Sequence, residues 1–350
     1  MLEPRIPPAG SPELAGRLKH KIDRKTKPLG SLGQLETLAL RLGMMQGTES
    51  PHIHAPHMLV FAADHGVAAE GVSAYPQEVT WQMVMNYLAG GAAVNVFARA
   101  QGLAVDVVDA GVNHKFDEHP HLLDRKVAMG TQNFTQGPAM TIAQCEQALE
   151  AGGRAARELN VLGCNLLALG EMGIANTTAA AALMARFTGL AAEACVGRGT
   201  GVDDAGLARK REVIRKALVL HHNVATPLEA LAALGGFEIA MMAGAMLAAA
   251  HERMIILVDG FVAGAALLAA RAIDPHVLDY CVFAHQSDET GHAAMLQHFH
   301  AEPLLKLKMR LGEGSGAALA LPLVRAACDF LNHMASFESA GVADKEGGAR

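Results

Sequence analysis

Two glutamates stand in glycine-rich turns that could present a carboxylate to a ligand. Glu171 follows Gly170 in the segment LGEMGIANTT, and Glu313 lies between Gly312 and Gly314 in the segment RLGEGSGAALAL. Glycine permits tight turns and close approach of a ligand. A carboxylate within hydrogen-bond reach of an N–H group can remove its proton as a general base. Both segments could therefore present a carboxylate to a ligand, although a solvent-facing loop is the default interpretation of Glu313.

Anion binding is the second chemistry that the sequence indicates. In the first segment an Ala-rich helix follows Gly173, and its start offers hydroxyl, amide and free backbone N–H groups at Ile174, Ala175, Asn176 and Thr177. A helix N-terminus of this kind binds phosphate. Helix capping alone would account for Asn176 or Thr177, but it would leave the carboxylate just upstream unexplained.

A second glycine-rich segment, VGRGTGVDDAGLARK, also suits a phosphate. Its candidate ligands are Gly197, Gly199, Thr200, Gly201 and, in the helix that follows, Lys210. The GxGxG spacing matches neither the GxGxxG dinucleotide loop nor the GxxxxGK[ST] loop, so the bare pattern is weak. A turn with Asp203 or Asp204 capping the next helix explains most of it without a ligand.

The elements that would position these residues alternate between strand and helix. Short apolar runs predict buried parallel strands at residues 58–66, 103–111, 165–173, 254–261 and 280–289. Near the end of each run stands one polar residue: Asp64, Asp109, Glu171, Asp259 and His285. The carboxyl ends of parallel strands meet at one edge of a sheet, where α/β proteins bind ligands. A cap or turn explains any single one of these residues, whereas five equivalent positions indicate a shared site.

Both ends of the chain are predicted to be helical. Capping signals and apolar spacing favour helices over residues 12–27 and 31–43 and a long helix over 314–337, with a kink at Pro322. The polar residues 338–350 are expected to fray.

The composition favours a globular cytoplasmic enzyme. Hydrophobic residues make up 51% of the 350 residues and charged residues 18%, which provides for a large core. The net charge of −6 is scattered, without a basic stripe, so nucleic acid is not an expected partner. Neither a signal peptide nor a membrane span is expected, because charged residues bound or break the apolar stretches 239–250 and 254–270.

Cysteines and histidines give little support to a metal site or to disulfides. The five cysteines are dispersed without a CxxC pair, which is typical of small buried side chains. His52, His54 and His57 are closely spaced but lie beside prolines, so surface positions are favoured over metal ligation.

Together these segments resemble the nicotinate-nucleotide:dimethylbenzimidazole phosphoribosyltransferase family. Matching blocks run in order from residue 27 to about residue 330 and include AADHGVAAEGVSAYPQEVT, GEMGIANTTAAAAL, GRGTGVDD, HQSDETGH and RLGEGSGAALAL. The resemblance implies an α/β fold, a Rossmann-like parallel sheet flanked by helices, with a small helical domain built from both chain ends. Residues 1–50 and 320–350 would form that small domain, and residues 51–319 the large catalytic domain.

The resemblance also implies a reaction and roles for individual residues. The family moves phosphoribosyl from nicotinate mononucleotide to a benzimidazole-type base, as a homodimer without a metal or organic cofactor. Glu313 would be the catalytic base and Glu171 a second catalytic carboxylate. The nucleotide would bind Gly173–Thr177, Gly197–Gly201, Lys210 and Asp259. The acceptor base would lie against Tyr75, Met83 and Gly312, and one branch of the family has polar residues where Tyr75 and Met83 stand.

Two other functions remain open from the residues alone. One is a metal-dependent transferase that uses phosphoribosyl pyrophosphate, with Asp203 and Asp204 holding Mg²⁺. Against it, the Gly/Thr loop precedes the acidic pair instead of following it. The other is a nucleotide sensor without turnover, which would gain little from two carboxylates near an anionic ligand.

Overall fold

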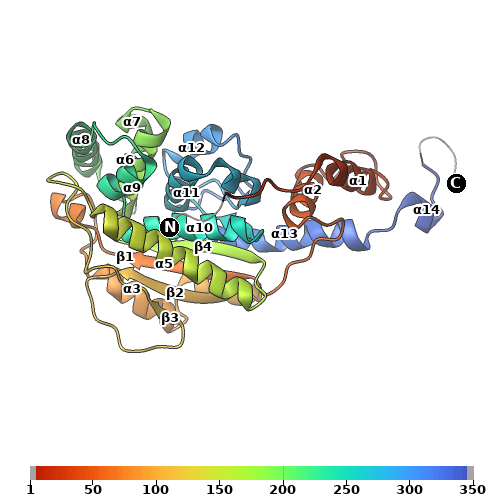
Figure 1. Cartoon of the computed structure of the whole chain (residues 1–350), viewed down its shortest axis with the longest axis horizontal. Helices are drawn as coiled ribbons and strands as arrows, with labels where there is room; N and C mark the ends of the chain where they lie inside the picture. Colours follow the sequence, from red (N-terminus) through yellow and green to blue (C-terminus); the bar gives the residue numbers. More distant parts are fainter. Residues whose placement is uncertain (1–4, 200, 345–350) are drawn as a thin grey trace.

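A parallel sheet of six strands forms the centre of the molecule (Figure 1). The computed structural model describes residues 5–199 and 201–344. The strands are β1 (His57–Ala63), β2 (Ala104–Gly111), β3 (Leu122–Asp124), β4 (Leu166–Met172), β5 (Ile255–Val258) and β6 (Cys281–Phe283). Their order is β3-β2-β1-β4-β5-β6, and every pairing is parallel. This order reverses between β1 and β4, as in doubly wound nucleotide-binding folds.

Helices flank the sheet. They are α1 (Pro12–Asp23), α2 (Gln34–Gln46), α3 (Val79–Leu88), α4 (Ala93–Ala100), α5 (Ile142–Val161), α6 (Asn176–Thr188), α7 (Ala192–Cys195), α8 (Asp204–Leu220), α9 (Pro227–Leu234), α10 (Phe237–His251), α11 (Phe261–Ile273), α12 (His292–His298), α13 (Ser315–His333) and α14 (Phe337–Ala340). Two 3-10 helices, η1 (Gly66–Glu70) and η2 (Pro275–Tyr280), complete the regular structure. The α/β fold with a Rossmann-like parallel sheet is therefore confirmed.

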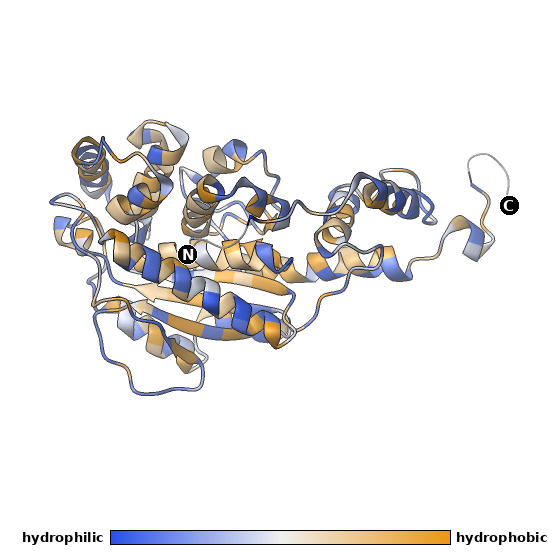
Figure 2. Cartoon of the chain, viewed as in Figure 1, coloured by the Kyte–Doolittle hydropathy of each residue, from blue (hydrophilic) through white to orange (hydrophobic). Residues whose placement is uncertain are grey.

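The five predicted strands are present, and β3 is an additional one that the sequence pattern did not show. The central strands are buried along nearly their whole length, in keeping with their continuous apolar runs (Figure 2). In contrast, β3 has three residues, pairs only with β2 and is partly exposed. A short edge strand needs no apolar run, so it leaves no signal in the sequence.

Small residues bring α5 and α10 into backbone contact. A Cβ atom at Gly152 would lie 1.9 Å from the carbonyl oxygen of Met241, and one at Gly244 would lie 1.9 Å from that of Leu149. A side chain at either glycine would therefore force the helices apart. This close packing explains why a chain so rich in Ala and Gly forms a layered α/β core.

The chain ends meet in an arm that extends away from the sheet (Figure 1). Leu14, Leu18 and Ile22 form the buried face of α1, which packs on α2, and α2 packs on α13. An isolated bridge joins Lys25 to Ser336. Because α13 is one continuous helix from the sheet into the arm, the predicted domain boundary at residues 319–320 falls inside a helix.

Several other expectations concern the surface and the ends. Part of the tail that was expected to fray forms α14, and residues 345–350 lie outside the described residues. All five cysteines are buried and free.

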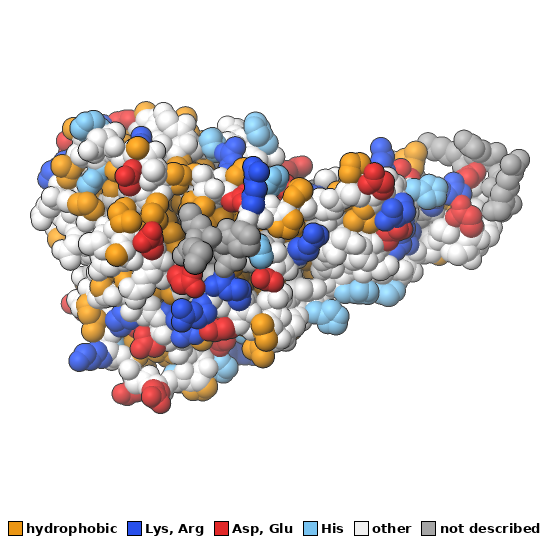
Figure 3. Space-filling model, viewed as in Figure 1, with side chains coloured by type: hydrophobic (Ala, Val, Ile, Leu, Met, Phe, Trp, Pro, Cys, Tyr) orange, Lys and Arg blue, Asp and Glu red, His pale blue; other side chains and the backbone are white. Residues whose placement is uncertain are grey.

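Basic and acidic side chains are interspersed on the face in Figure 3. Within residues 5–199 and 201–344, every helix is too short or too polar to cross a bilayer.

Candidate active site

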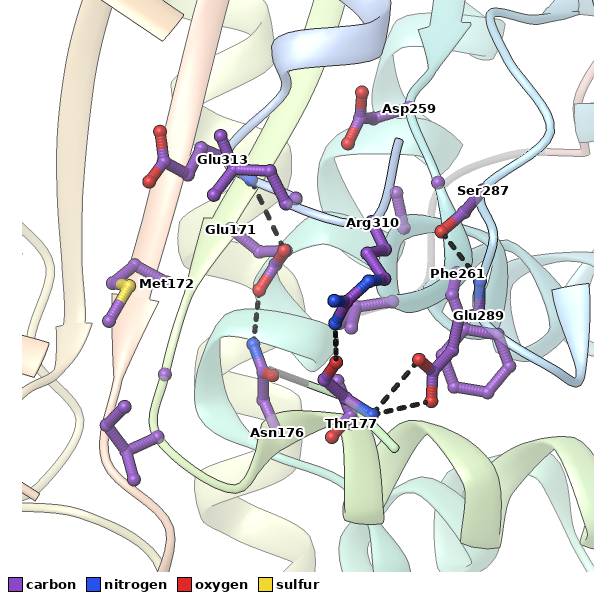
Figure 4. Close-up of a pocket in the computed structure, with 18 of the residues that line it drawn as sticks. Glu171, Met172, Asn176, Thr177, Asp259, Phe261, Ser287, Glu289, Arg310 and Glu313 are labelled. Atoms are coloured by element: carbon purple, nitrogen blue, oxygen red, sulfur yellow. Dashed lines mark hydrogen bonds between the residues drawn. The ribbon is translucent and has the colours of Figure 1, made fainter. Parts of the chain in front are cut away.

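A cavity of about 630 Å³ opens at the carboxyl edge of the sheet (Figure 4). This volume suits a small-molecule ligand. The predicted site residues that line it are Tyr75, Met83, Glu171, Gly173, Ile174, Asn176, Thr177, Gly199, Asp259, Gly312 and Glu313. Segments far apart in the sequence thus share one cavity, with both glutamates among them.

The remaining predicted residues lie around this cavity or away from it. Ala175 and Lys210 line a smaller hollow of about 30 Å³ that shares Gly173 and the start of α6 with the main cavity. Gly197 and Gly201 line neither, although a Cβ at Gly197 would lie 2.1 Å from the cavity residue Glu289. Thr200 lies outside the described residues.

Glu313 is held in a turn of unusual backbone conformation. Gly312, Glu313 and Gly314 have φ angles of +83°, +65° and +87°. Left-handed backbone is costly for a residue with a side chain and persists only where the surroundings enforce it. Here β4 enforces it, because a Cβ at Gly170 would lie 2.2 Å from the carbonyl oxygen of Glu313. Only glycine at position 170 allows the turn to approach the strand this closely.

The carboxyl group of Glu313 has the properties of a general base. The residue is 7% exposed, and its Oε2 atom is buried without a hydrogen-bond partner. Burial raises the pKa of Glu313, whereas the Val94 N–H and the Tyr87 hydroxyl oppose the shift, and the negative charge of Asp259 adds to it. A carboxylate that lines a cavity and has a raised pKa is suited to accept a proton from a bound ligand.

Glu171 is the opposite case, because both of its oxygens are occupied. Its Oε2 accepts a hydrogen bond from Asn176 Nδ2, and its Oε1 accepts one from the backbone N–H of Glu313 at 3.4 Å. Burial raises the pKa of Glu171 to about 8; Asn176 opposes this shift, and Asp259 and Glu238 add to it. In Figure 4 the Glu171 carboxyl faces Asn176, and that of Glu313 points away from it. Glu171 therefore ties the Glu313 turn to the start of α6.

The other end of the site is suited to an anion. Lys210 is 1% exposed, and its Nζ donates a hydrogen bond to Thr177 Oγ1 at 2.9 Å. Burial lowers the pKa of Lys210 to about 8, against an opposing effect of Glu289. A Cβ at Gly199 would lie 3.2 Å from this Nζ. This site therefore brings together Lys210, the first turn of α6 and the side-chain-free backbone at Gly199. Phosphate sites are built from groups of this kind.

Sequence reasoning missed several residues that line the cavity. Both oxygens of Glu289 accept the backbone N–H of Gly199, at 3.2 and 3.1 Å, and Arg310 donates to the Gly199 carbonyl at 3.3 Å. His285, one of the five strand-end residues expected to share a site, does line the cavity, and its Nε2 lies 3.7 Å from Asp259 Oδ1. Glu289 and Arg310 lie in the matching blocks HQSDETGH and RLGEGSGAALAL, but neither was assigned a role, because each acts by contact with a loop about 90 or more residues away.

Two of the five strand-end residues do not reach the cavity. Asp64 accepts the backbone N–H of Asn113 at 2.7 Å, and Asp109 pairs with Lys126 at 2.7 Å. These two carboxylates therefore stabilise loops, and only Glu171, Asp259 and His285 of the five line the cavity.

The alternative metal sites also have structural explanations. Asp203 caps α8 through the Gly206 N–H, and the Asp204 side chain is 91% exposed and pairs with Arg198. His52 and His54 are exposed, as predicted, whereas His57 is half-buried and pairs with Asp106 at 2.8 Å. Among residues 5–199 and 201–344, no group of His, Cys, Asp and Glu side chains is arranged to hold a metal ion.

An α/β fold with carboxylates and anion-binding groups in one cavity defines an enzyme that acts on a phosphorylated small molecule. The family model described as phosphoribosyltransferase matches residues 8–342. The chain belongs to this family, that of the nicotinate-nucleotide–dimethylbenzimidazole phosphoribosyltransferases, as its motifs predict.

Relatives and solved structures resemble the chain over nearly its whole length. It is 57% identical to the nicotinate-nucleotide–dimethylbenzimidazole phosphoribosyltransferase of Aromatoleum aromaticum, over 95% of this chain and 97% of that protein. It is 59% identical to the protein of the same name from Cupriavidus necator, over 94% and 95%. The crystal structure of CobT from Thermus thermophilus superposes with a TM-score of 0.93 at 49% identity, covering 95% and 99%.

Proposed function

We propose that this chain transfers 5-phosphoribosyl from nicotinate mononucleotide to 5,6-dimethylbenzimidazole or a related base. The products are nicotinate and α-ribazole 5′-phosphate, the nucleotide of the lower ligand of cobalamin. The observation that carries the proposal is the cavity of about 630 Å³, which is lined both by Glu313, with its unpaired carboxyl oxygen, and by Thr177, which accepts a hydrogen bond from the buried Lys210. The names of the relatives support the choice of both substrates.

The chemistry needs one base and no acid. The bond from C1′ of the ribose to the pyridinium nitrogen breaks, its electron pair goes to that nitrogen, and nicotinate leaves without taking up a proton. One ring nitrogen of the benzimidazole forms the new bond to C1′ from the opposite face, which converts a β-nucleotide into an α-nucleotide. The other ring nitrogen loses its proton to a carboxylate.

Glu313 is the carboxylate that we assign to this proton transfer. Its carboxyl lines the cavity and keeps at least one oxygen free for a proton, whereas both oxygens of Glu171 accept hydrogen bonds. With a pKa of about 8, Glu171 is mostly protonated at neutral pH and carries little charge to stabilise a cationic ribose. We therefore assign Glu171 mainly to holding the Glu313 turn and the first turn of α6 in place.

The two ends of the cavity would bind different parts of the substrates. We assign the phosphate to Lys210, Thr177 and the first turn of α6, beside Gly199, whose own N–H donates to Glu289. We assign the ribose to the neighbourhood of Asp259. Such anchoring would orient C1′ between the leaving and entering rings.

The acceptor base would lie in an apolar slot beside Glu313. Tyr75, Met83 and Gly312 line this part of the cavity, together with Val79 and Leu311. Apolar side chains suit a flat methylated ring, and the lack of polar partners here leaves Glu313 to recognise the ring N–H. We further propose that the enzyme acts as a homodimer in the cytoplasm, with no metal or organic cofactor.

Release of nicotinate tests the proposal. Purified protein is incubated with nicotinate mononucleotide, with and without dimethylbenzimidazole, and both products are separated by chromatography. We expect nicotinate and α-ribazole 5′-phosphate in equal amounts, only when the acceptor is present, and at an unchanged rate in excess EDTA. Binding of the nucleotide without release would instead indicate a sensor, and loss of the rate in EDTA, restored by Mg²⁺, would indicate a metal-dependent transferase.

A further inference from the structure

Tyr87 is a buried residue whose hydroxyl group has no explanation in the fold. It lies on α3, the helix that also carries the cavity residues Val79 and Met83, and it is 3% exposed. Its hydroxyl is buried without a hydrogen-bond partner. Leaving a buried hydroxyl unpaired costs free energy, and phenylalanine would fill the same space without that cost.

A second buried and unpaired atom belongs to the base itself. Oε2 of Glu313 is also buried without a hydrogen-bond partner. The two groups are near enough for each to act on the ionisation of the other, although they form no hydrogen bond of normal geometry. A carboxylate can only accept and a phenol can donate, so each group is the partner that the other lacks.

We propose that Tyr87 positions Glu313 by donating a hydrogen bond to Oε2 when the substrates are bound, which leaves Oε1 to take the proton of the acceptor base. Catalytic hydrogen bonds are often long in an unliganded enzyme and tighten in the reacting complex. This inference rests on the proposed function, because it gives Tyr87 a role in the proton transfer assigned to Glu313.

Three groups act on the ionisation of the Glu313 carboxyl, and a fourth holds the Glu313 backbone. The Tyr87 hydroxyl on α3 and the Val94 N–H on α4 favour its charged form. Asp259, at the end of β5, disfavours that form. Glu171 on β4 contacts the backbone N–H of Glu313 and is itself held mostly protonated. Because the charge of Glu313 depends on few donors, removal of one should change its titration measurably.

The variant Tyr87→Phe tests the inference. We expect kcat to fall roughly tenfold while KM for nicotinate mononucleotide stays unchanged, since the phosphate and ribose contacts are untouched. The acid limb of the pH profile of kcat/KM should move to higher pH by about one unit, because loss of the donor raises the pKa of Glu313. The melting temperature should stay the same or rise, because an unpaired hydroxyl is removed.

Tyr280→Phe is the matched control. Tyr280 is also fully buried, but its hydroxyl donates to the carbonyl oxygen of Pro7 at 3.0 Å, and it does not line the cavity. This variant should lower the melting temperature and leave the pH profile unchanged, the reverse of the result for Tyr87→Phe.

A double-mutant cycle completes the test. If Tyr87 acts through Glu313, Tyr87→Phe should cause little further loss of kcat in a Glu313→Gln background. The inference is overturned if Tyr87→Phe keeps the wild-type kcat and pH profile, or if its loss of rate is the same in both backgrounds. Failure of the wild-type protein to release nicotinate would overturn the proposed function itself, whereas normal wild-type turnover with an unaltered Tyr87→Phe would overturn this inference alone.

Discussion

The end of β4 and the turn before α13 offer the same short motif, a glutamate beside glycine, but the fold uses them differently. Glu171 belongs to a regular strand, and its carboxyl is enclosed by hydrogen bonds from both neighbouring segments. Glu313 belongs to a left-handed turn, and its carboxyl keeps a buried oxygen unpaired. A strand fixes the side chain direction, whereas a strained turn can aim it into a cavity.

This difference shows how two nearby acids can be assigned separate roles. The hydrogen bonds of Glu171 are structural, because they join the turn, the strand and α6. The unpaired oxygen of Glu313 instead indicates a functional group, because buried polar atoms in structural positions are normally hydrogen-bonded. The predictions below test this division of roles.

The largest expected effect comes from removing the base. Glu313→Gln should lower kcat by roughly 10²–10⁴-fold, because the amide cannot accept the proton of the acceptor ring. Binding of nicotinate mononucleotide, measured by calorimetry, should stay close to the wild-type value. A near-normal rate of nicotinate release would remove Glu313 from the mechanism.

A methyl group added at Gly170, where β4 meets the Glu313 turn, should have the next largest effect on the rate. In Gly170→Ala the new Cβ would overlap the carbonyl oxygen of Glu313, which lies 2.2 Å from that position. Displacement of the turn by about 1 Å can cost on the order of 10²-fold in rate, and the overlap should destabilise the fold by about 1–3 kcal/mol.

Gly137→Ala is the control, because its Cβ would meet nothing within 4 Å. Both variants are compared by nicotinate release and by chemical unfolding. Wild-type activity and stability in Gly170→Ala would mean that the strand does not hold the turn in place.

Loss of the Glu171 carboxyl should have a smaller effect on the rate. Glu171→Gln removes a group that is mostly neutral at pH 7, and the amide can still accept one of the two hydrogen bonds. We expect kcat to fall by about tenfold or less. A loss as large as that in Glu313→Gln would make Glu171 the base and reverse the comparison.

The last prediction concerns the pH dependence of stability and leaves the rate aside. The pKa of Glu171 is raised from 4.5 to about 8 by folding, so the folded state holds a proton that the unfolded state releases above pH 4.5. The free energy of unfolding should fall between pH 4.5 and about 8, by up to roughly 1.4 kcal/mol per pH unit from this group.

Glu171→Gln should lack this component. In urea unfolding, the free energy of unfolding of Glu171→Gln minus that of the wild type should therefore increase from pH 5 to pH 8. Above pH 8 this difference should stay constant. A constant difference across that range would show that Glu171 is already ionised in the folded protein.

Periodicity predicted most of the sheet but could not predict all of it. Five buried strands left continuous apolar runs, and each is present near the predicted position. The edge strand β3 left none, because its three residues are partly exposed. The same reasoning predicted that five polar residues share one edge of the sheet. Asp64 and Asp109, however, bind nearby donors and do not line the cavity.

The site was predicted best where local backbone geometry carries the function. Glycines around Glu171 and Glu313, and the start of α6, are visible in the sequence because a tight turn or a helix N-terminus needs particular residue types. Glu289, Arg310 and Tyr87 were not predicted. Each has a common residue type to which no role was assigned from the sequence, and each acts only by contact with a distant part of the chain.

The sequence by itself determined the parallel α/β fold, the family and the two glutamates, since apolar runs and glycine turns are local properties. Only the tertiary structure decided which glutamate keeps a free oxygen. That outcome depends on burial and on donors supplied by α3, α4, α6 and the Glu313 turn, which lie far apart along the chain. Desolvation acts over a few ångströms in space, and no spacing in a sequence records it.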